Sequence, residues 1–140
     1  MALIPTRPGL LHAEWLLIGV ALLHLWEVEG HGLVWWGYGA FFAAVVAWQG
    51  LYSVLLPRRS ASRAFLLAGI GTNAALVLLW TYTRFVAAVP VGPHRHLEPV
   101  GAVDLLTMAL QTFVIVLLAK ALYATYPRRA APRPLGAVPA

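Results

Sequence analysis

"GAVDLLTMALQTFVIVLLAKALYATY" (residues 101–126) is the stretch that decides the fold class of this chain. It contains one acid, Asp104 near its start, and one base, Lys120 near its end. At about 1.5 Å per residue, a helix of this length crosses a hydrocarbon layer about 30 Å thick. A helix is expected because lipid offers no partner for unpaired backbone groups. The stretch therefore predicts a transmembrane helix.

Three further apolar segments occupy residues 10–28, 33–56 and 64–89, and glycines or prolines flank all four segments. Over the 140 residues, 61% are hydrophobic and only 11% are charged, whereas about a quarter of positions are charged in soluble domains. The mean hydropathy is +0.76. The sequence predicts an all-α polytopic membrane protein, a bundle of four antiparallel transmembrane helices within a single domain, residues 1–126.

The first apolar segment is expected to remain in the mature protein, and both ends of the chain are expected to be cytoplasmic. The first segment lacks a small-x-small cleavage site, so it is expected to be a helix rather than a signal peptide. Residues 127–140, "PRRAAPRPLGAVPA", predict a flexible basic tail rich in Pro and Ala.

Arginines fix the predicted orientation. Arg7 precedes the first segment, Arg58, Arg59 and Arg63 lie between the second and third, and three more arginines follow the fourth. The positive-inside rule then places both termini in the cytoplasm of a bacterial cell, with the chain in its cytoplasmic membrane. The net charge of +5 lies beside apolar segments, which indicates lipid head groups as partners rather than nucleic acid.

Polar side chains gather at the predicted outer ends of the segments. Imidazole and carboxylate groups suit zinc, iron or copper, so this cluster is a tentative metal or small-ligand site. Its members are His24, Glu27, His31, His94, His96 and Glu98. Gly30 is expected to end the first helix before His31. No HExxH motif accompanies the cluster, and no cofactor beyond a possible transition metal is predicted.

Haem is not expected. His12 and His24 are the two histidines inside the spanning segments, and both lie on the first segment. They are about 18 Å apart along a helix axis, so they cannot act as opposing axial ligands.

Several ionisable or amide side chains fall inside the spanning segments, where such groups usually mark a pairing or a site. Arg84 and Asp104 lie at similar depth and predict an ion pair, with a bound anionic substrate or lipid at Arg84 as the alternative. Asn73, Gln111 and Gln49 lie nearer mid-membrane and predict hydrogen bonds between helices, or else a polar pathway.

Small residues recur at three- and four-residue spacing on the second and third segments. Such spacing lets helix backbones approach closely, within one chain or between chains. The residues are Ala40, Ala43, Ala44 and Ala47 on the second segment, and Ala68, Gly71 and Ala75 on the third.

Several short motifs together carry a resemblance to a known group of proteins. They are "HLWE", "WWGYGAFF" followed by Gln49, "TYTR", "GPH" and "EPVGAVDLL", and they span residues 23–106. Together they resemble small, uncharacterised four-helix bacterial integral membrane proteins. The resemblance implies a four-helix membrane protein with a polar outer side, and it implies no activity.

Three functions remain open at this point. The chain has no cysteine, and its serines lie far from any histidine, so no nucleophile and base are expected to meet and the protein is not predicted to be an enzyme. The favoured hypothesis is a non-catalytic accessory or scaffold subunit, associated with another membrane protein or with itself. A metal or small-ligand binding protein is the first alternative, and a small transporter is the second.

Overall fold

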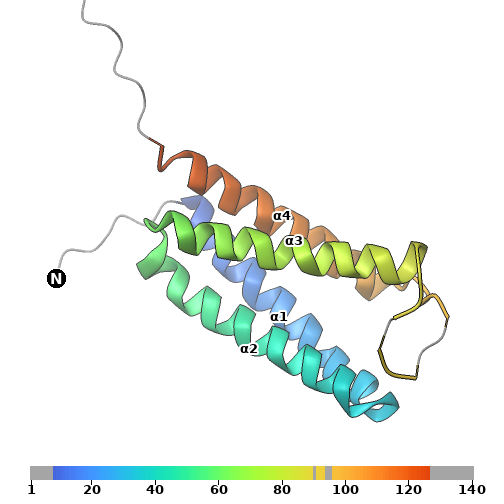
Figure 1. Ribbon diagram of the computed structural model, residues 1–140. Coiled ribbons are helices and arrows are strands. Elements are labelled where there is room, and N and C mark those ends of the chain that lie inside the picture. The colour runs from blue at the N-terminus through green and yellow to red at the C-terminus, as the bar shows by residue number, and fades with distance from the viewer. Residues whose placement is uncertain (1–7, 90, 94–95, 127–140) are drawn as a thin grey trace, which may run out of the picture.

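The protein folds as four long helices in a computed structural model, which describes residues 8–89, 91–93 and 96–126. The helices are α1 (Pro8–Val34), α2 (Trp36–Arg59), α3 (Arg63–Phe85) and α4 (Ala102–Tyr123). Each is long and apolar enough to cross a membrane. The predicted all-α bundle of four helices is therefore confirmed (Figure 1).

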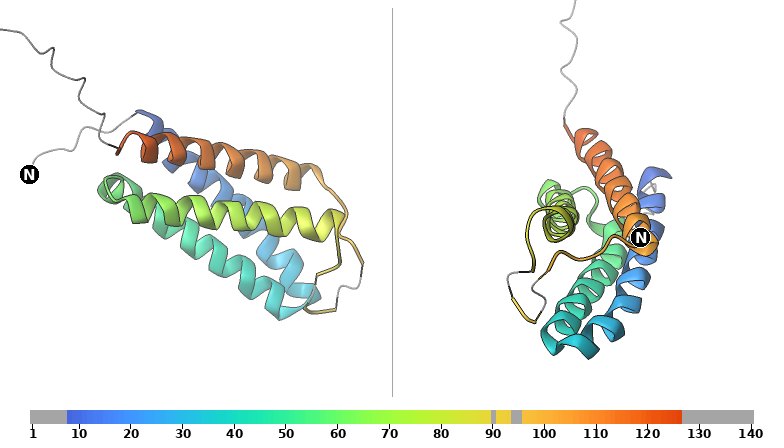
Figure 2. Two further views of the ribbon diagram at one scale, coloured as in Figure 1. Left: turned by 45° about the horizontal axis from the view of Figure 1, so that its top comes forward. Right: turned by 90° about the vertical axis from the view of Figure 1, so that its right-hand side faces the viewer.

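The helices form an open row rather than a closed ring. The well-packed pairs among the described residues are α1 with α2, α1 with α4, and α3 with α4. The order of neighbours is thus α2, α1, α4, α3, which leaves α2 and α3 as the outer members. The right-hand view of Figure 2 shows the connection between α3 and α4 lying beside these two helices.

The two ends of the bundle differ. At one end, called the loop end here, α1 meets α2 at Trp35 and residues 86–101 connect α3 to α4. The opposite end, called the arginine end, has Arg58, Arg59 and Arg63. There Arg63 donates to the carbonyl of Thr125 at 2.9 Å and lies over the ring of Tyr126 at 4.4 Å, which joins the start of α3 to the end of α4.

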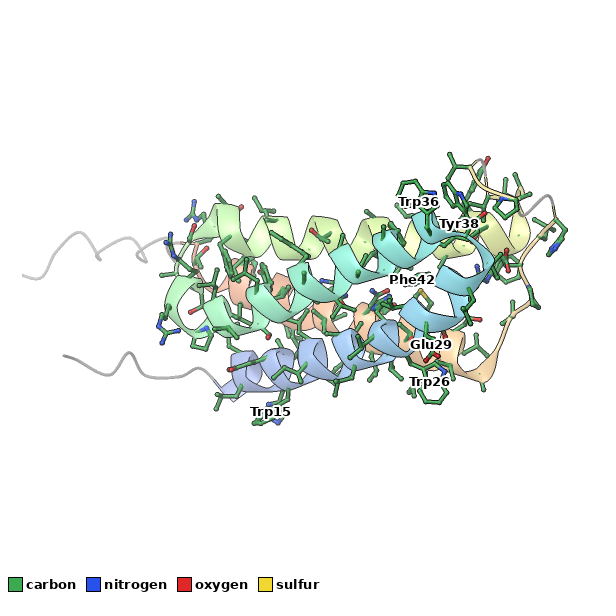
Figure 3. All side chains as sticks on the ribbon, turned by 90° about the horizontal axis from the view of Figure 1, so that it is seen from below. Trp15, Trp26, Glu29, Trp36, Tyr38 and Phe42 are labelled. Carbon is green, nitrogen blue, oxygen red and sulfur yellow. The ribbon has the colours of Figure 1, made fainter. Side chains whose placement is uncertain are left out.

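Large apolar side chains cover the outside of the bundle. Trp15, Trp26 and Trp36 project away from it, with exposed fractions of 71%, 78% and 75% (Figure 3). In water, so much exposed indole would favour aggregation. In a bilayer the same side chains contact lipid, and Trp is enriched near membrane–water interfaces.

The apolar core lies in the half of the bundle nearest the arginine end. It combines the first turns of α1 and α3 with the last turns of α2 and α4. Its members are Leu10, Ala13, Leu17, Tyr52, Leu56, Leu66, Val114, Leu118 and Ala121. The half nearest the loop end contains His24, Glu27, Arg84 and Asp104, which are buried or half-buried.

A single contact, called the Tyr52 junction here, joins the two outer helices within the core. The ring of Tyr52 on α2 stacks on that of Phe65 on α3, with centroids 4.3 Å apart. Its hydroxyl donates to the carbonyl of Phe65 at 3.0 Å. A Cβ atom at Gly69 would overlap the Tyr52 ring, so the junction requires glycine at that position.

The expectation that Gly30 ends the first helix is wrong. Helix α1 continues through Gly30 and Gly32 to Val34. The backbones of α1 and α2 come close at Gly32 and Gly39, because a Cβ at Gly39 would lie 2.9 Å from the Gly32 Cα. Gly32 and Gly39 therefore serve helix packing, whereas Gly30 meets open space.

The third helix is shorter than predicted, and the second is shifted by three residues toward the C-terminus, from 33–56 to Trp36–Arg59. Helix α3 ends at Phe85 rather than at residue 89, because the carbonyl of Thr83 accepts the N–H of Glu98 at 3.1 Å instead of a helical donor. Pro57 lies inside the last turn of α2, where the loss of one backbone hydrogen bond has little effect. The predicted tail, residues 127–140, lies outside the described residues.

The small residues of α2 and α3 are not used for packing within the chain. All seven are exposed, namely Ala40, Ala43, Ala44, Ala47, Ala68, Gly71 and Ala75. The spacing left two alternatives open, contact within one chain and contact between chains. Because these faces are exposed, they do not form helix contacts within one chain.

The Tyr52 junction gives a direct test of the fold, with two glycines on α3 as a matched pair. Gly69→Ala should lower the free energy of unfolding by about 1–3 kcal/mol, because the new methyl group overpacks the core. Gly71→Ala, which meets open space, should be neutral or raise it by up to about 1 kcal/mol. Unfolding in mixed detergent micelles measures both. Equal effects at the two positions would contradict the junction.

Candidate functional site

A pocket of about 260 Å³ lies at the loop end, between the diverging halves of the bundle. All four helices and the α3–α4 connection contribute to its walls. Its apolar part includes Phe41 and Phe42 of α2, Leu76 and Leu79 of α3, and Met108 of α4. Cavities with mostly apolar walls and a few convergent polar groups are the usual form of small-molecule sites. We call this cavity the loop-end pocket.

The α3–α4 connection forms the roof of the pocket. Tyr38 of α2 donates its hydroxyl to the carbonyl of Val91 at 2.7 Å, and the Glu98 backbone bonds to Thr83 of α3. Gly92 has φ of +82°, and a Cβ there would overlap the rings of Tyr38 and Trp35. The connection is thus held on both outer helices, α2 and α3.

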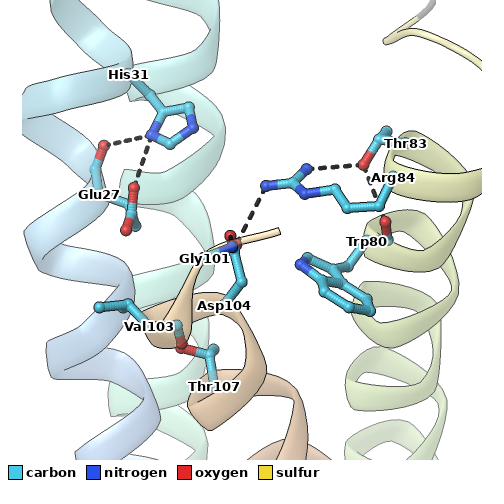
Figure 4. A network of polar contacts seen from close by, with 9 residues as sticks. All are labelled: Glu27, His31, Trp80, Thr83, Arg84, Gly101, Val103, Asp104 and Thr107. Carbon is cyan, nitrogen blue, oxygen red and sulfur yellow. Dashed lines mark hydrogen bonds and ion pairs between the residues drawn. The ribbon is translucent and has the colours of Figure 1, made fainter. Parts of the chain in front are cut away.

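An ion pair lies under this roof. Arg84 of α3 donates to a carboxylate oxygen of Asp104 on α4 at 3.1 Å and to the hydroxyl of Thr83 at 3.0 Å. The other carboxylate oxygen of Asp104 accepts the N–H of Gly101 at 3.0 Å, which caps α4. Figure 4 shows the guanidinium reaching from α3 across to α4. The pairing explains how both charges are tolerated between apolar helices.

Two hydrogen-bond donors beside the ion pair have no partner among the described residues. They are Nε1 of Trp80 and Nε of Arg84, and both atoms are buried. The Arg84 guanidinium also lies 6.0 Å from the centre of the Trp80 ring. A buried donor without an acceptor costs about 1–3 kcal/mol, so this part of the pocket has surplus donor capacity.

On the opposite wall, Glu27 and His31 of α1 interact one helical turn apart. Nδ1 of His31 lies 3.0 Å from a carboxylate oxygen of Glu27 and 3.1 Å from its backbone carbonyl (Figure 4). The ring of His31 also packs on Phe42, with centroids 4.6 Å apart. This geometry exists because α1 continues past Gly30.

His24 lies deeper, and 5% of its surface is exposed. Its Nδ1 is 3.0 Å from the carbonyl of Val20 and 3.1 Å from Oε1 of Gln49. A carbonyl can only accept, so Nδ1 carries the hydrogen and the neutral ring keeps Nε2 as an acceptor. His24 also lines the loop-end pocket.

A layer of four buried polar side chains, one from each helix, lies near mid-bundle: His24, Gln49, Asn73 and Gln111. Each lies roughly 13–20 Å along its own helix from the loop end. Several of their amide atoms have no partner among the described residues, namely Gln49 Nε2, Asn73 Oδ1, and Gln111 Oε1 and Nε2. Asn73 Nδ2 donates to the carbonyl of Gly69 at 2.8 Å. We call this set the polar layer.

The structure does not bring all residues of the predicted metal cluster together. Glu27, His31, His24 and Glu98 line the pocket, whereas His96 is exposed. His94 lies outside the described residues. Within the described part of the chain, no three His, Asp or Glu side chains lie where they could hold a metal ion. The metal site therefore stays a prediction.

Two residues of the site were not identified from the sequence. Tyr38 and Thr83 hold the roof, and both are buried. Tyr38 lies in "WWGYG" and Thr83 in "TYTR", motifs whose side chains are common in membrane helices. Only their partners in the α3–α4 connection distinguish these two residues from their neighbours.

The ion pair predicts a specific order of stabilities. Arg84→Met should lower the free energy of unfolding by about 2–3 kcal/mol, because it leaves the Asp104 carboxylate without its cation. Adding Asp104→Asn should restore at least half of that loss, since Asn can still cap α4 but has no charge. Unfolding of both variants in mixed micelles measures the order. If the double variant is the less stable one, the two residues contribute independently.

The loop-end pocket thus combines an apolar body, an ion pair and unused donors in one cavity. No protein-family model matches the chain, and no curated protein or solved structure is detectably similar to it. What this site does is therefore inferred from the chemistry of its own residues.

Proposed function

We propose that the chain is a non-catalytic integral membrane protein that binds a small molecule in the loop-end pocket. The observation that carries this proposal is the coincidence of an apolar cavity with buried, unused donors on Trp80 and Arg84. Each unmet donor costs about 1–3 kcal/mol. A ligand that supplies an acceptor to these groups and an apolar surface to Phe41 and Phe42 would recover that free energy.

The proposal retains four of the six residues of the predicted outer cluster and takes the small-ligand form of that prediction rather than the metal form. His24, Glu27, His31 and Glu98 line the pocket, as a small-ligand site built from these residues requires. The walls contribute more aromatic and aliphatic surface than carboxylate or imidazole, which favours an organic ligand over a bare metal ion.

We also infer which side of the membrane the pocket faces. Arg58, Arg59 and Arg63 lie at the arginine end, and the positive-inside rule puts such residues in the cytoplasm. Both termini are then cytoplasmic, and the loop-end pocket lies in the outer half of a bacterial cytoplasmic membrane.

A second candidate function is association with another membrane helix, in a homo-oligomer or as an accessory subunit. It is favoured by the outward-facing small residues of α2, among them Ala40, Ala44 and Ala47. Small residues on a lipid-exposed face let a second helix approach closely. The two functions are compatible, because none of these three alanines lines the pocket.

Filling the pocket tests the first proposal. The protein purified in mild detergent should yield close to one small organic molecule per chain by solvent extraction and mass spectrometry. Met108→Trp should remove that molecule, because the indole occupies the pocket. Leu105→Trp on the exposed face of the same helix should retain it. No recoverable molecule from the wild type, or equal retention by both variants, would count against the pocket.

Association through α2 has its own matched pair. Ala44→Phe should shift the protein to a smaller assembly, because the ring keeps a second helix at a distance. Ala109→Phe, also at an exposed alanine but on α4, should leave the assembly unchanged. Native mass spectrometry from micelles gives the number of chains. A monomeric wild-type protein that captures no partner would remove this candidate.

A further inference from the structure

The loop-end pocket has one side without a packed helix neighbour. Helices α2 and α3 meet at the Tyr52 junction near the arginine end but are not a well-packed pair over their length. At the pocket, Phe41 of α2 and Leu79 of α3 are 40% and 41% exposed. Both residues line the cavity, so the cavity reaches the surface that faces lipid.

The route along the bundle axis is covered instead. Tyr38 and Thr83 hold the α3–α4 connection over the loop end through Val91 and Glu98. A ligand therefore reaches the pocket most directly from the bilayer, between α2 and α3, which selects for a lipid-soluble molecule.

Charge in the described lining disfavours an anion. Three carboxylates, those of Glu27, Glu98 and Asp104, line the pocket with the single guanidinium of Arg84. That guanidinium is already paired with Asp104 at 3.1 Å. An anionic head group would leave water or the lipid interface for a mostly apolar cavity whose guanidinium is already paired, which is strongly unfavourable.

The unmet hydrogen bonds disfavour a simple cation. The unused groups beside the ion pair are donors, on Trp80 and Arg84. Arg84 uses its two terminal nitrogens to reach Thr83 and Asp104, and a guanidinium has five N–H groups in all. Beside the Arg84 guanidinium, an ammonium ligand would add positive charge and further donors, and it would leave the Trp80 and Arg84 donors without an acceptor.

Size and shape complete the description. An apolar cavity of about 150 Å³ binds benzene, so about 260 Å³ has room for a substituted ring. Aromatic walls from Trp80 and Phe42 suit a flat molecule, since ring pairs gain attraction beyond burial alone.

From these observations we propose that the ligand is a neutral, lipid-soluble quinone or related ring carbonyl compound. Its oxygen accepts hydrogen bonds from Arg84 and Trp80, and its ring lies among the aromatic walls. Its tail leaves between α2 and α3. Both donor atoms are buried in this structure, so binding of the oxygen requires the two side chains to rotate. This inference rests on the proposed small-molecule function and narrows it to one class of ligand.

Three probes with the same tail test the class. The protein is placed in nanodiscs and titrated with decyl-benzoquinone, decanoate or decyltrimethylammonium, and partition into empty nanodiscs is subtracted. The quinone should bind saturably at about one per chain. The anion and the cation should show partition only.

Two variants locate the binding. Trp80→Phe keeps an aromatic ring and removes one donor, so quinone binding should weaken by roughly five- to tenfold. Met108→Trp should abolish it, and Leu105→Trp should leave it unchanged. Thermal unfolding of each variant checks that the fold is intact.

The outcomes separate this inference from the broader proposal. Saturable binding of decanoate or decyltrimethylammonium without the quinone overturns the ligand class and leaves the pocket as a small-molecule site. Quinone binding that survives Met108→Trp, or the absence of saturable binding by all three probes, overturns the quinone inference. The pocket proposal itself fails only if solvent extraction of the wild-type protein also yields no bound molecule.

Discussion

The Tyr52 junction is the contact on which the shape of this bundle depends. It joins the two outer helices of an otherwise open row, and it does so only near the arginine end. Because the core lies around the same ring, that end is closed and densely packed. The opposite ends of α2 and α3 lack a comparable contact, so a cavity forms between them. Packing at one end of the molecule thus creates space at the other.

Polar groups between apolar helices are arranged by the need to find partners. Arg84 pairs with Asp104, and Asp104 also caps α4 by accepting the N–H of Gly101. One carboxylate therefore compensates a positive charge and stabilises the start of a helix. His24 and Gln49 share one hydrogen bond across α1 and α2, while Gln49 Nε2 has no partner in the described chain. The remaining donors of Trp80 and Arg84 find no acceptor in the described chain. In a low dielectric such a surplus is costly, and both residues lie in the wall of the loop-end pocket.

The close crossing of α1 and α2 shows how local signals can mislead. Gly30 and Gly32 resemble helix terminators when they are considered one at a time. In the fold α1 continues through both of them. Gly32 lies close to Gly39 of α2, and His31 lies beside Glu27. Similarly, the spacing of the small residues on α2 and α3 indicates helix contact, yet the structure leaves these faces exposed. Propensity and spacing do not say which surface a neighbour will cover.

The sequence by itself determined the class of the fold, because four apolar segments of membrane-spanning length admit only helices in lipid. It also determined the depth of Arg84 and Asp104, since position along a helix fixes height in the membrane. The tertiary structure decided which helices are neighbours, which side is open, and which polar atoms lack partners. Those features depend on contacts between distant residues, such as Tyr52 with Gly69 and Tyr38 with Val91. No pattern within one helix encodes such contacts, because each depends on the shapes of two surfaces that meet only after folding.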